Sequence, residues 1–358
     1  MAEVEKQGLR VLINRGAEKL LRSGQLILLL DRQKGEPLAG AVRMEPGRLA
    51  ARDNKLILEG KALSADETEI RAENGTDPVS IGGRRYRGRL YLKASGDDLL
   101  LINAVTLDQY LYGVLPSEVP ENWPMEALKA QALAARTYAL VRAGSADFAH
   151  YDVDDSTQSQ VYMGTLNEGP RSRSAVDATH GLVVAYKDKL AETFFYSNCG
   201  GHSADSRNVW GRDIPYLQGV EDPYCKDEPH FKWKSSVLHA KIQKTLQTAT
   251  HGLKTWDTID LLKKDGSGRW TQVRLSGVHG EKTMASATFR MAAGPNLVKS
   301  TNFEWHRRGD KDEFKGFGWG HGVGLCQEGS KGMADQGYRF RAILAHYFPG
   351  TQIRRLTD

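Results

Sequence analysis

Glu118 is the acidic residue with the most constrained setting in the sequence. It lies between Pro116 and Pro120 in the stretch LYGVLPSEVPENWP. Each proline fixes its own φ angle and restricts the backbone of the residue before it. We therefore expect Glu118 to lie in a stiff loop with its carboxyl group aimed in a fixed direction, as general acid catalysis requires.

A helix is predicted directly after this acid, over residues 124–143. Ala, Leu, Lys, Gln and Arg dominate there, and Gly144 follows. Its small residues recur at helical spacing, which indicates a central, buried helix. Lys129 and Arg136 are seven residues apart and share another face. They form either a solvated face or a pocket wall that binds polar substrate groups and fixes Glu118.

Two Cys/His pairs have spacings that suit a metal ion. Cys199 and His202 form a Cys-x-x-His pair, and Cys225 lies five residues before His230. Together they predict a Cys₂His₂ zinc site, whose closed shell of four ligands would be structural. The alternative is a Cys199–Cys225 disulfide, with His202 as a polar pocket residue. The third cysteine, Cys326, is then a small buried group.

A glycine-rich stretch near the C-terminus, GFGWGHGVGLCQEGSKGMADQGY, has glycine at alternate positions. It matches neither a dinucleotide-binding fingerprint nor a P-loop. Alternate glycines allow close approach of a ligand or of another strand, and Phe317 and Trp319 suit stacking on sugar rings. His321 and Gln327 are the polar candidates, although His321 could equally be a buried histidine in a tight turn.

The elements that must position these residues predict an α+β fold. Residues 1–95 read as short strands, a β-rich N-terminal region packed on a mixed α/β core. Residues 96–358 form that core, with a β-rich subdomain at about 235–310. Further helices are expected at 170–180, near 238–249 and through most of 331–348.

Composition excludes several classes of protein. The chain has 358 residues and a net charge of +5 from 49 basic and 44 acidic residues. No basic run interleaved with aromatic residues indicates nucleic-acid binding, and no segment is long and apolar enough to cross a bilayer. The opening MAEVEKQGLRVLINRG lacks a signal-peptide pattern. This leaves either a cytoplasmic protein or one whose export signal or anchor has been removed. We expect the second, an exported protein of the cell envelope or periplasm.

Three segments together resemble the SpoIID/LytB family of cell-wall proteins, of the stage II sporulation protein D type. They are YLYGVLPSEVPENWPMEALKAQALAARTYAL, YSNCGGHSADSRNVWG with PYLQGV, and GFGWGHGVGLCQEGSKGMADQGY with ILAHYFPGT. The similarity also touches ATFRMAAGPNLVKSTNF. The similarity runs from about residue 85 to the end. One departure is Cys326, where many relatives carry a small polar residue.

The resemblance implies a lytic transglycosylase that acts on peptidoglycan glycan strands, preferably strands stripped of stem peptides. Glu118 matches the catalytic acid of the family. The substrate-binding residues implied or suggested by the motifs are Lys129, Gln131, Arg136, Tyr196, Ser197, His321 and Gln327. Some members bind zinc near the CGG motif, where Cys199, His202, Cys225 and His230 are the local candidates.

Only one acid lies in a constrained motif, which fits this reaction better than ordinary glycoside hydrolysis with two carboxylates. Since the acid must first be protonated, we expect burial to raise its pKa and the nearby cations to avoid it. One alternative is a glycan-binding enhancer of a separate cell-wall amidase, as in LytB-type members. Another is a carbohydrate-binding module with structural zinc. A membrane-anchored partner is also possible for such a protein.

Overall fold

The computed structural model describes residues 8–15, 26–34, 36–38, 42–43, 49–65, 67–72, 79–81, 83–145, 150–156, 159–250, 253 and 255–356. The predicted α+β class is confirmed, because these residues form both helices and several sheets. Residues 1–7, at the start of the segment searched for an export signal, lie outside the described ones. Among the described residues, no helix has the length and apolar character needed to cross a membrane.

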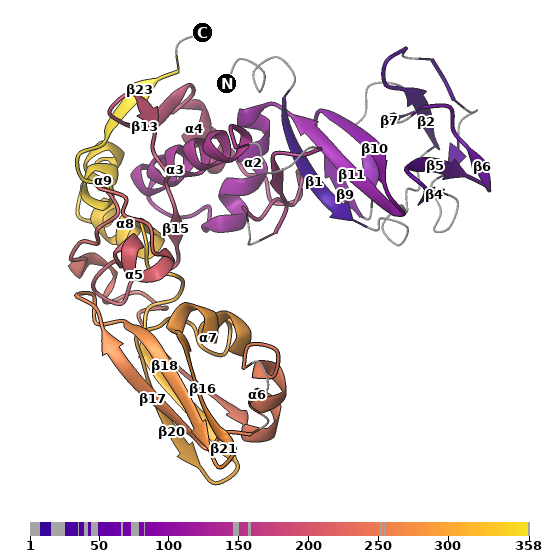
Figure 1. Ribbon diagram of the computed structural model, residues 1–358. Helices are drawn as coiled ribbons and strands as arrows, with labels where there is room; N and C mark the ends of the chain where they lie inside the picture. Colours follow the sequence, from indigo (N-terminus) through magenta and orange to yellow (C-terminus); the bar gives the residue numbers. More distant parts are fainter. Residues whose placement is uncertain are drawn as a thin grey trace.

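Seven strands form the largest sheet, at the N-terminal end of the molecule (Figure 1). Their order is β12 (Val153–Asp154), β1 (Leu9–Arg15), β11 (Asp98–Val105), β10 (Arg89–Ser95), β7 (Glu67–Ala72), β2 (Leu26–Asp31) and β3 (Val42–Arg43). Smaller sheets join β4 (Leu49–Arg52), β5 (Lys55–Leu58) and β6 (Lys61–Ala62), and also β8 (Val79–Ile81) and β9 (Arg84–Tyr86).

The sheet continues across the boundary expected at residue 95. Strands β10 and β11 form an antiparallel hairpin in which Ser95 pairs with Asp98. Strand β12, which comes after the central helix in sequence, pairs in parallel with β1. The N-terminal strands and the start of the core therefore share one sheet.

Helices α2 (Leu107–Glu118), α3 (Met125–Ala143) and α4 (Pro170–Asp177) come after the long strands of this sheet. Thr106 begins α2 with a capping box, because its hydroxyl accepts from the Gln109 N–H and the Gln109 side chain accepts from the Thr106 N–H. The predicted central helix is confirmed as α3, most of whose side chains are buried. Its Leu128 lies in the apolar core against the large sheet, while Leu133 lies in a second core.

The second core brings distant signature segments together. Strand β15 (Phe195–Tyr196) pairs in parallel with β22 (Leu325–Cys326). Around them lie α5 (Ser206–Trp210), the short 3₁₀ turn at Pro223–Cys225, α8 (Gln327–Asp335) and α9 (Phe340–Tyr347), together with a sheet of β14 (Lys189–Leu190), β13 (Leu182–Tyr186) and β23 (Gln352–Arg355).

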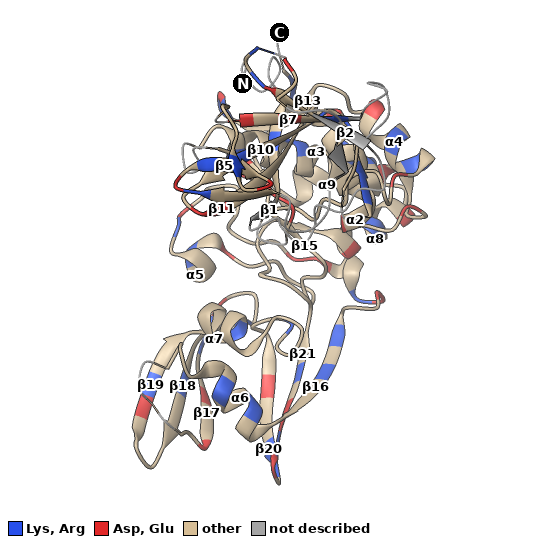
Figure 2. Ribbon diagram, turned by 90° about the vertical axis from the view of Figure 1, so that its right-hand side faces the viewer, with Lys and Arg blue, Asp and Glu red and all other residues tan. Residues whose placement is uncertain are grey.

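A β-rich subdomain is inserted between β15 and β22 and forms a separate lobe (Figures 1 and 2). It contains β16 (Lys232–Leu238), α6 (His239–Leu246), β17 (Thr258–Lys264), β18 (Trp270–Gly277), β19 (Gly280–Ala285), α7 (Ser286–Ala293), β20 (Phe303–Arg308) and β21 (Lys311–Phe317). Its two ends are neighbours, because Lys232 pairs with Phe317. The subdomain has an apolar core of its own, between Trp233 and Phe314 in sequence.

Candidate active site and thiol cluster

A cavity of about 620 Å³ lies between the core and the inserted subdomain. The core contributes Glu118, Tyr138, Tyr196, Ser197, His321 and Gln327 to its lining. The subdomain contributes Asp265, Arg269, Trp270 and Arg290. The candidate acid is therefore placed in a cleft that has walls from both lobes.

Glu118 is the last residue of helix α2, so the expectation that it lies in a loop is wrong. The helix tolerates Pro116 near its end and stops at Val119, which has extended φ and ψ angles of −137° and 145°. This conformation is the one that a residue before proline prefers, and Pro120 is next in the chain. The second proline thus fixes where the helix ends, and the acid projects from its last turn.

The carboxyl group of Glu118 has a raised pKa. Burial is the largest cause, because it disfavours the charged form. The backbone N–H of Val161 donates to Oε1 at 2.9 Å and lowers the pKa in part. The neighbouring Gln327 amide also lowers it, although its Nε2 has no partner at ordinary hydrogen-bond geometry. Among the described residues, no cation is a cause of the shift, as expected for a general acid.

Asp265 is the other carboxylate in the described lining of the cavity. Its Oδ1 accepts hydrogen bonds from the Ser267 N–H at 2.9 Å and the Arg269 N–H at 3.1 Å. These bonds close a turn in the subdomain, which is a common structural role of aspartate. Asp265 was not among the candidates from the sequence.

Aromatic side chains cover much of the core side of the cavity. Trp210 is partly exposed, and its ring lies 4.6 Å from that of Phe194 and 5.1 Å from that of His321. Trp319 also lines the cavity and carries Lys299 Nζ 4.0 Å above its ring. Such surfaces suit the apolar faces of sugar rings.

Four predicted substrate-binding residues line this cavity: Tyr196, Ser197, His321 and Gln327. The parallel pairing of β15 with β22 explains how segments about 130 residues apart meet, and the Glu328 N–H donates to the Ser197 carbonyl at 3.0 Å. Their proposed role in binding remains a prediction.

His321 contributes a neutral ring to the wall. Its Nδ1 accepts from the Val323 N–H at 3.1 Å, so Nε2 carries the proton and donates to the Phe195 carbonyl, also at 3.1 Å. Burial and the nearby Arg290 lower its pKa to about 3. Both nitrogens are thus held by the backbone, and the side chain offers no proton to exchange.

Lys129, Gln131 and Arg136 are not among the lining residues. Lys129 Nζ pairs with Glu126 Oε1 at 2.8 Å. Arg136 is buried and donates to Asp108 Oδ1 at 3.0 Å and to the Thr179 carbonyl at 2.8 Å. The amide of Gln131 is buried without a protein partner. The structure therefore gives Arg136 a role in joining helices instead of a place in the cavity wall.

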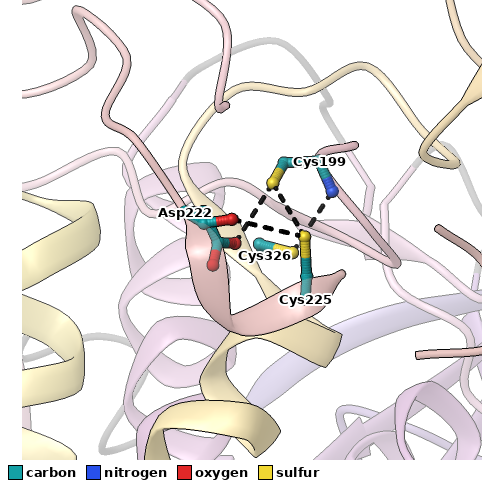
Figure 3. Close-up of side chains that lie close together, drawn as sticks. All are labelled: Cys199, Asp222, Cys225 and Cys326. Atoms are coloured by element: carbon teal, nitrogen blue, oxygen red, sulfur yellow. Dashed lines mark hydrogen bonds between the residues drawn. The ribbon is translucent and has the colours of Figure 1, made fainter. Parts of the chain in front are cut away.

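A cluster of four buried side chains lies behind the wall of the cavity: Cys199, Asp222, Cys225 and Cys326 (Figure 3). One ligand atom from each lies within 4.8 Å of all the others. The Cys199 and Cys225 sulfurs are 3.3 Å apart, and all three cysteines are free thiols in the structure. Three thiols and a carboxylate form a donor set of the kind that zinc accepts, and tetrahedral zinc needs sulfurs roughly 3.8 Å apart.

Backbone N–H groups point at these sulfurs. The Gly201 N–H donates to Cys199 Sγ at 3.3 Å, and the N–H groups of Cys199 and Gly329 donate to Cys326 Sγ at 3.2 and 3.3 Å. Burial raises the pKa of the Cys199 and Cys326 thiols, whereas hydrogen bonds from these two hold the pKa of Cys225 low. These backbone N–H groups are thus placed to stabilise cysteine thiolates.

The structure separates the four residues that were predicted as zinc ligands. His202 bonds through Nδ1 to the Ser203 carbonyl at 2.7 Å, and His230 through Nδ1 to Glu328 Oε1 at 2.6 Å, so neither belongs to the cluster. Cys326 and Asp222 lie beside Cys199 and Cys225 instead. The number of cysteines was a signal for Cys326, because it leaves one thiol over, but Asp222 carried no sequence signal.

The family model of stage II sporulation protein (SpoIID) matches residues 95–186, and that of a domain of unknown function (DUF8618) matches residues 216–324. Stage II sporulation protein D of Bacillus subtilis is 34% identical over 314 residues, 82% of this chain and 87% of the relative. An uncharacterised protein of Brachyspira hyodysenteriae is also 34% identical, over 77% of this chain and 74% of its own length.

The amidase enhancer of Bacillus subtilis is 26% identical over 85% of this chain, which spans 49% of that relative. The first family model contains Glu118 and helix α3, whereas the second contains the subdomain side of the cavity. From this similarity, extended over most of two relatives, the chain belongs to the SpoIID/LytB family.

Proposed function

We propose that this protein is a peptidoglycan lytic transglycosylase of the cell envelope. Membership of the SpoIID/LytB family, with a sporulation protein and an amidase enhancer among its relatives, supports a cell-wall-related function. The observation that carries the proposal is the setting of Glu118, a carboxyl group with a raised pKa in a cleft lined with aromatic rings.

The reaction needs one acid that later acts as a base. Protonated Glu118 donates its proton to the glycosidic oxygen between MurNAc and GlcNAc, and the bond from C1 to that oxygen breaks. The carboxylate then accepts the proton of the MurNAc C6 hydroxyl, whose oxygen bonds to C1. The product is a 1,6-anhydro sugar, the acid is restored and no water is consumed. The raised pKa of Glu118 favours the first step.

The test is a Glu118→Gln variant incubated with glycan strands stripped of stem peptides. Because a positioned acid contributes about 10²- to 10⁴-fold, we expect a loss of that size in anhydro product measured by mass spectrometry. Glu121→Gln is the matched control, since Glu121 Oε1 accepts from the Arg171 N–H outside the cavity. Anhydro product from Glu118→Gln at the wild-type rate would contradict the assignment.

The same products separate the other candidate activities. Hydrolysis with help from Asp265 would give reducing ends in place of anhydro ends. A glycan-binding enhancer of a separate amidase would release neither, and nor would a carbohydrate-binding module; one Bacillus subtilis relative is named an amidase enhancer. An enhancer would in addition raise product release by a separate cell-wall amidase.

We also propose that Cys199, Asp222, Cys225 and Cys326 hold a structural zinc ion. Bound zinc would fix the four segments that carry these ligands, with no part in the reaction itself. We expect about one zinc per chain by elemental analysis and three reactive thiols after denaturation with a chelator, with metal content lowered in Cys326→Ser. One reactive thiol and no metal would instead show the Cys199–Cys225 disulfide.

A further inference from the structure

Arg269 is a buried cation that faces the cavity without an acidic partner. Only 1% of the residue is exposed, and it lies among the lining residues. Its Nη2 donates to the Cys199 carbonyl at 2.8 Å, but its Nε and Nη1 have no hydrogen-bond partner. Among the described residues, no carboxylate lies within ion-pair distance of it. These two nitrogens are themselves buried, so Arg269 carries a desolvated positive charge with two unmade hydrogen bonds.

Arg290, on helix α7, is a second buried cation in the same lining, 9% exposed. Its Nε donates to the Lys299 carbonyl at 3.0 Å, and its Nη1 lies 3.5 Å from the sulfur of Met291. It too has no ion pair within the described part of the chain. Burial and the nearby positive charge of Arg269 lower its pKa to about 10. The two guanidinium groups thus lie close enough to repel one another.

The local backbone is shaped to hold Arg269 in this place. Gly322 has a φ angle of +90°, and a Cβ atom there would lie 2.7 Å from Arg269 Cζ. The acid in the wall, Asp265, turns its Oδ1 to backbone N–H groups and forms no ion pair with either arginine. Two buried like charges without a counter-charge are costly, and an anion between them would offset that cost.

We infer that Arg269 and Arg290 form a subsite for a carboxylate of the substrate, the free lactyl carboxylate of a MurNAc residue without its stem peptide. This inference rests on the proposed function. The hydroxyl and acetamido groups of the glycan are neutral, so the lactyl group is its anionic feature, and attachment of a peptide converts it to an amide. Guanidinium groups bind carboxylates through paired, charge-assisted hydrogen bonds, which an amide cannot match.

The acid and the proposed carboxylate subsite lie on different lobes. Glu118 belongs to the core, whereas both arginines belong to the inserted subdomain, within the segment that matches a domain of unknown function. The subdomain would thus select stripped strands and the core would cleave them.

The test compares stripped glycan strands with the same strands after their carboxylates are converted to methylamides. Binding is measured with Glu118→Gln protein, and cleavage with protein that keeps Glu118. We expect methylamidation to weaken both by about 10- to 100-fold, from the strength of hydrogen bonds to charged groups. Arg290→Gln and Arg269→Gln should weaken binding and cleavage of unmodified strands by the same factor. These variants should discriminate little between unmodified and methylamidated strands.

Arg274→Gln is the matched control, because Arg274 lies further along strand β18 and pairs with Asp260 outside the cavity. If Arg269→Gln fails to fold, Arg290→Gln alone decides. Variants that discriminate as strongly as wild type, or a wild-type protein that binds both strands equally, overturn the subsite even when anhydro product forms. Carboxylate-dependent binding without anhydro product overturns the proposed function and leaves the subsite standing. If polyglycerol phosphate competes with glycan strands for binding and methylamidation of the strands has no effect, the arginines form a phosphate site and the carboxylate subsite is overturned.

Discussion

The surroundings of Glu118 favour its neutral form. The free energy of unfolding should therefore depend on the pH at which Glu118 ionises. Its folded pKa is raised above the reference value of 4.5 by burial. Below pH 4.5 both folded and unfolded chains are protonated and no penalty exists. As the pH rises through the folded pKa, the unfolded chain is favoured by about 1.4 kcal/mol for each unit of pKa difference.

Glu118→Gln should therefore be more stable than wild type at high pH. The glutamine oxygen can still accept from the Val161 N–H, and the variant has no charge to bury. We expect its melting temperature to exceed that of wild type at pH 8 and to equal it near pH 4, while wild-type activity falls as pH rises through the folded pKa. Thermal unfolding across this range is the measurement. A difference in melting temperature between the variant and wild type that is the same at every pH would contradict the role given to the Glu118 charge.

The sequence identified some residues of the candidate site and not others, for physical reasons. Glu118 could be found because two prolines mark it. Arg136 shares a helical face with Lys129, but periodicity does not reveal whether a cation faces a cleft or the end of another helix. Arg269 carries no local pattern, and Arg290 lies in the segment ATFRMAAGPNLVKSTNF without a spacing that marks it as a site residue. Only the fold shows that both line the cavity and that neither forms an ion pair among the described residues.

Arg136 on helix α3 joins that helix to α2 and α4. The guanidinium donates to Asp108 at the start of α2 and to the carbonyls of Val176 and Thr179 at the end of α4. It thereby adds a charged donor to carbonyls at the C-terminal end of α4, where the helix dipole favours a positive charge. Helices α3 and α4 were predicted from composition and from the glycines that follow them, whereas α2 was not predicted. The connection through Arg136 depends on how the three helices pack.

Arg136→Met should destabilise the protein by about 3 kcal/mol, because it removes a buried guanidinium that donates hydrogen bonds to Asp108 and to the Val176 and Thr179 carbonyls. Lys129→Met on the same helix is the control. It removes a partly exposed ion pair with Glu126 and should cost less than about 1 kcal/mol. Urea unfolding of both variants gives the comparison. Similar values for the two would show that Arg136 does not join the helices as described.

At the scale of the whole molecule, the inserted subdomain is separable from the core. Its apolar core lies between Trp233 and Phe314, apart from those of the helices and the large sheet. Its β-rich character was predicted from the stretch WDTIDLLKKDGSGRWTQVRLSG, which reads as strands with a glycine turn. The cleft against the core was not, because it depends on how two lobes face one another.

Replacing residues 234–315 by a short Gly/Ser turn should leave a folded core. Lys232 and Phe317 are already paired, so the turn has little distance to span. We expect a melting temperature within about 5 °C of the full chain, equivalent to one or two kcal/mol, and unchanged metal content. Cleavage of glycan strands should fall at least 100-fold, because one wall of the cleft is lost. Full activity in the shortened protein would show that the subdomain is not part of the site.

The pairing of β16 with β21 has an evolutionary consequence. Since the chain leaves and re-enters the core at neighbouring points, a single genetic insertion or deletion between residues 232 and 317 can exchange the whole lobe without moving the core. Descendants of one ancestral gene can thus acquire different lobes at this position while they inherit the same acid. Diversification of substrate preference in the lineage would then follow the history of this one junction.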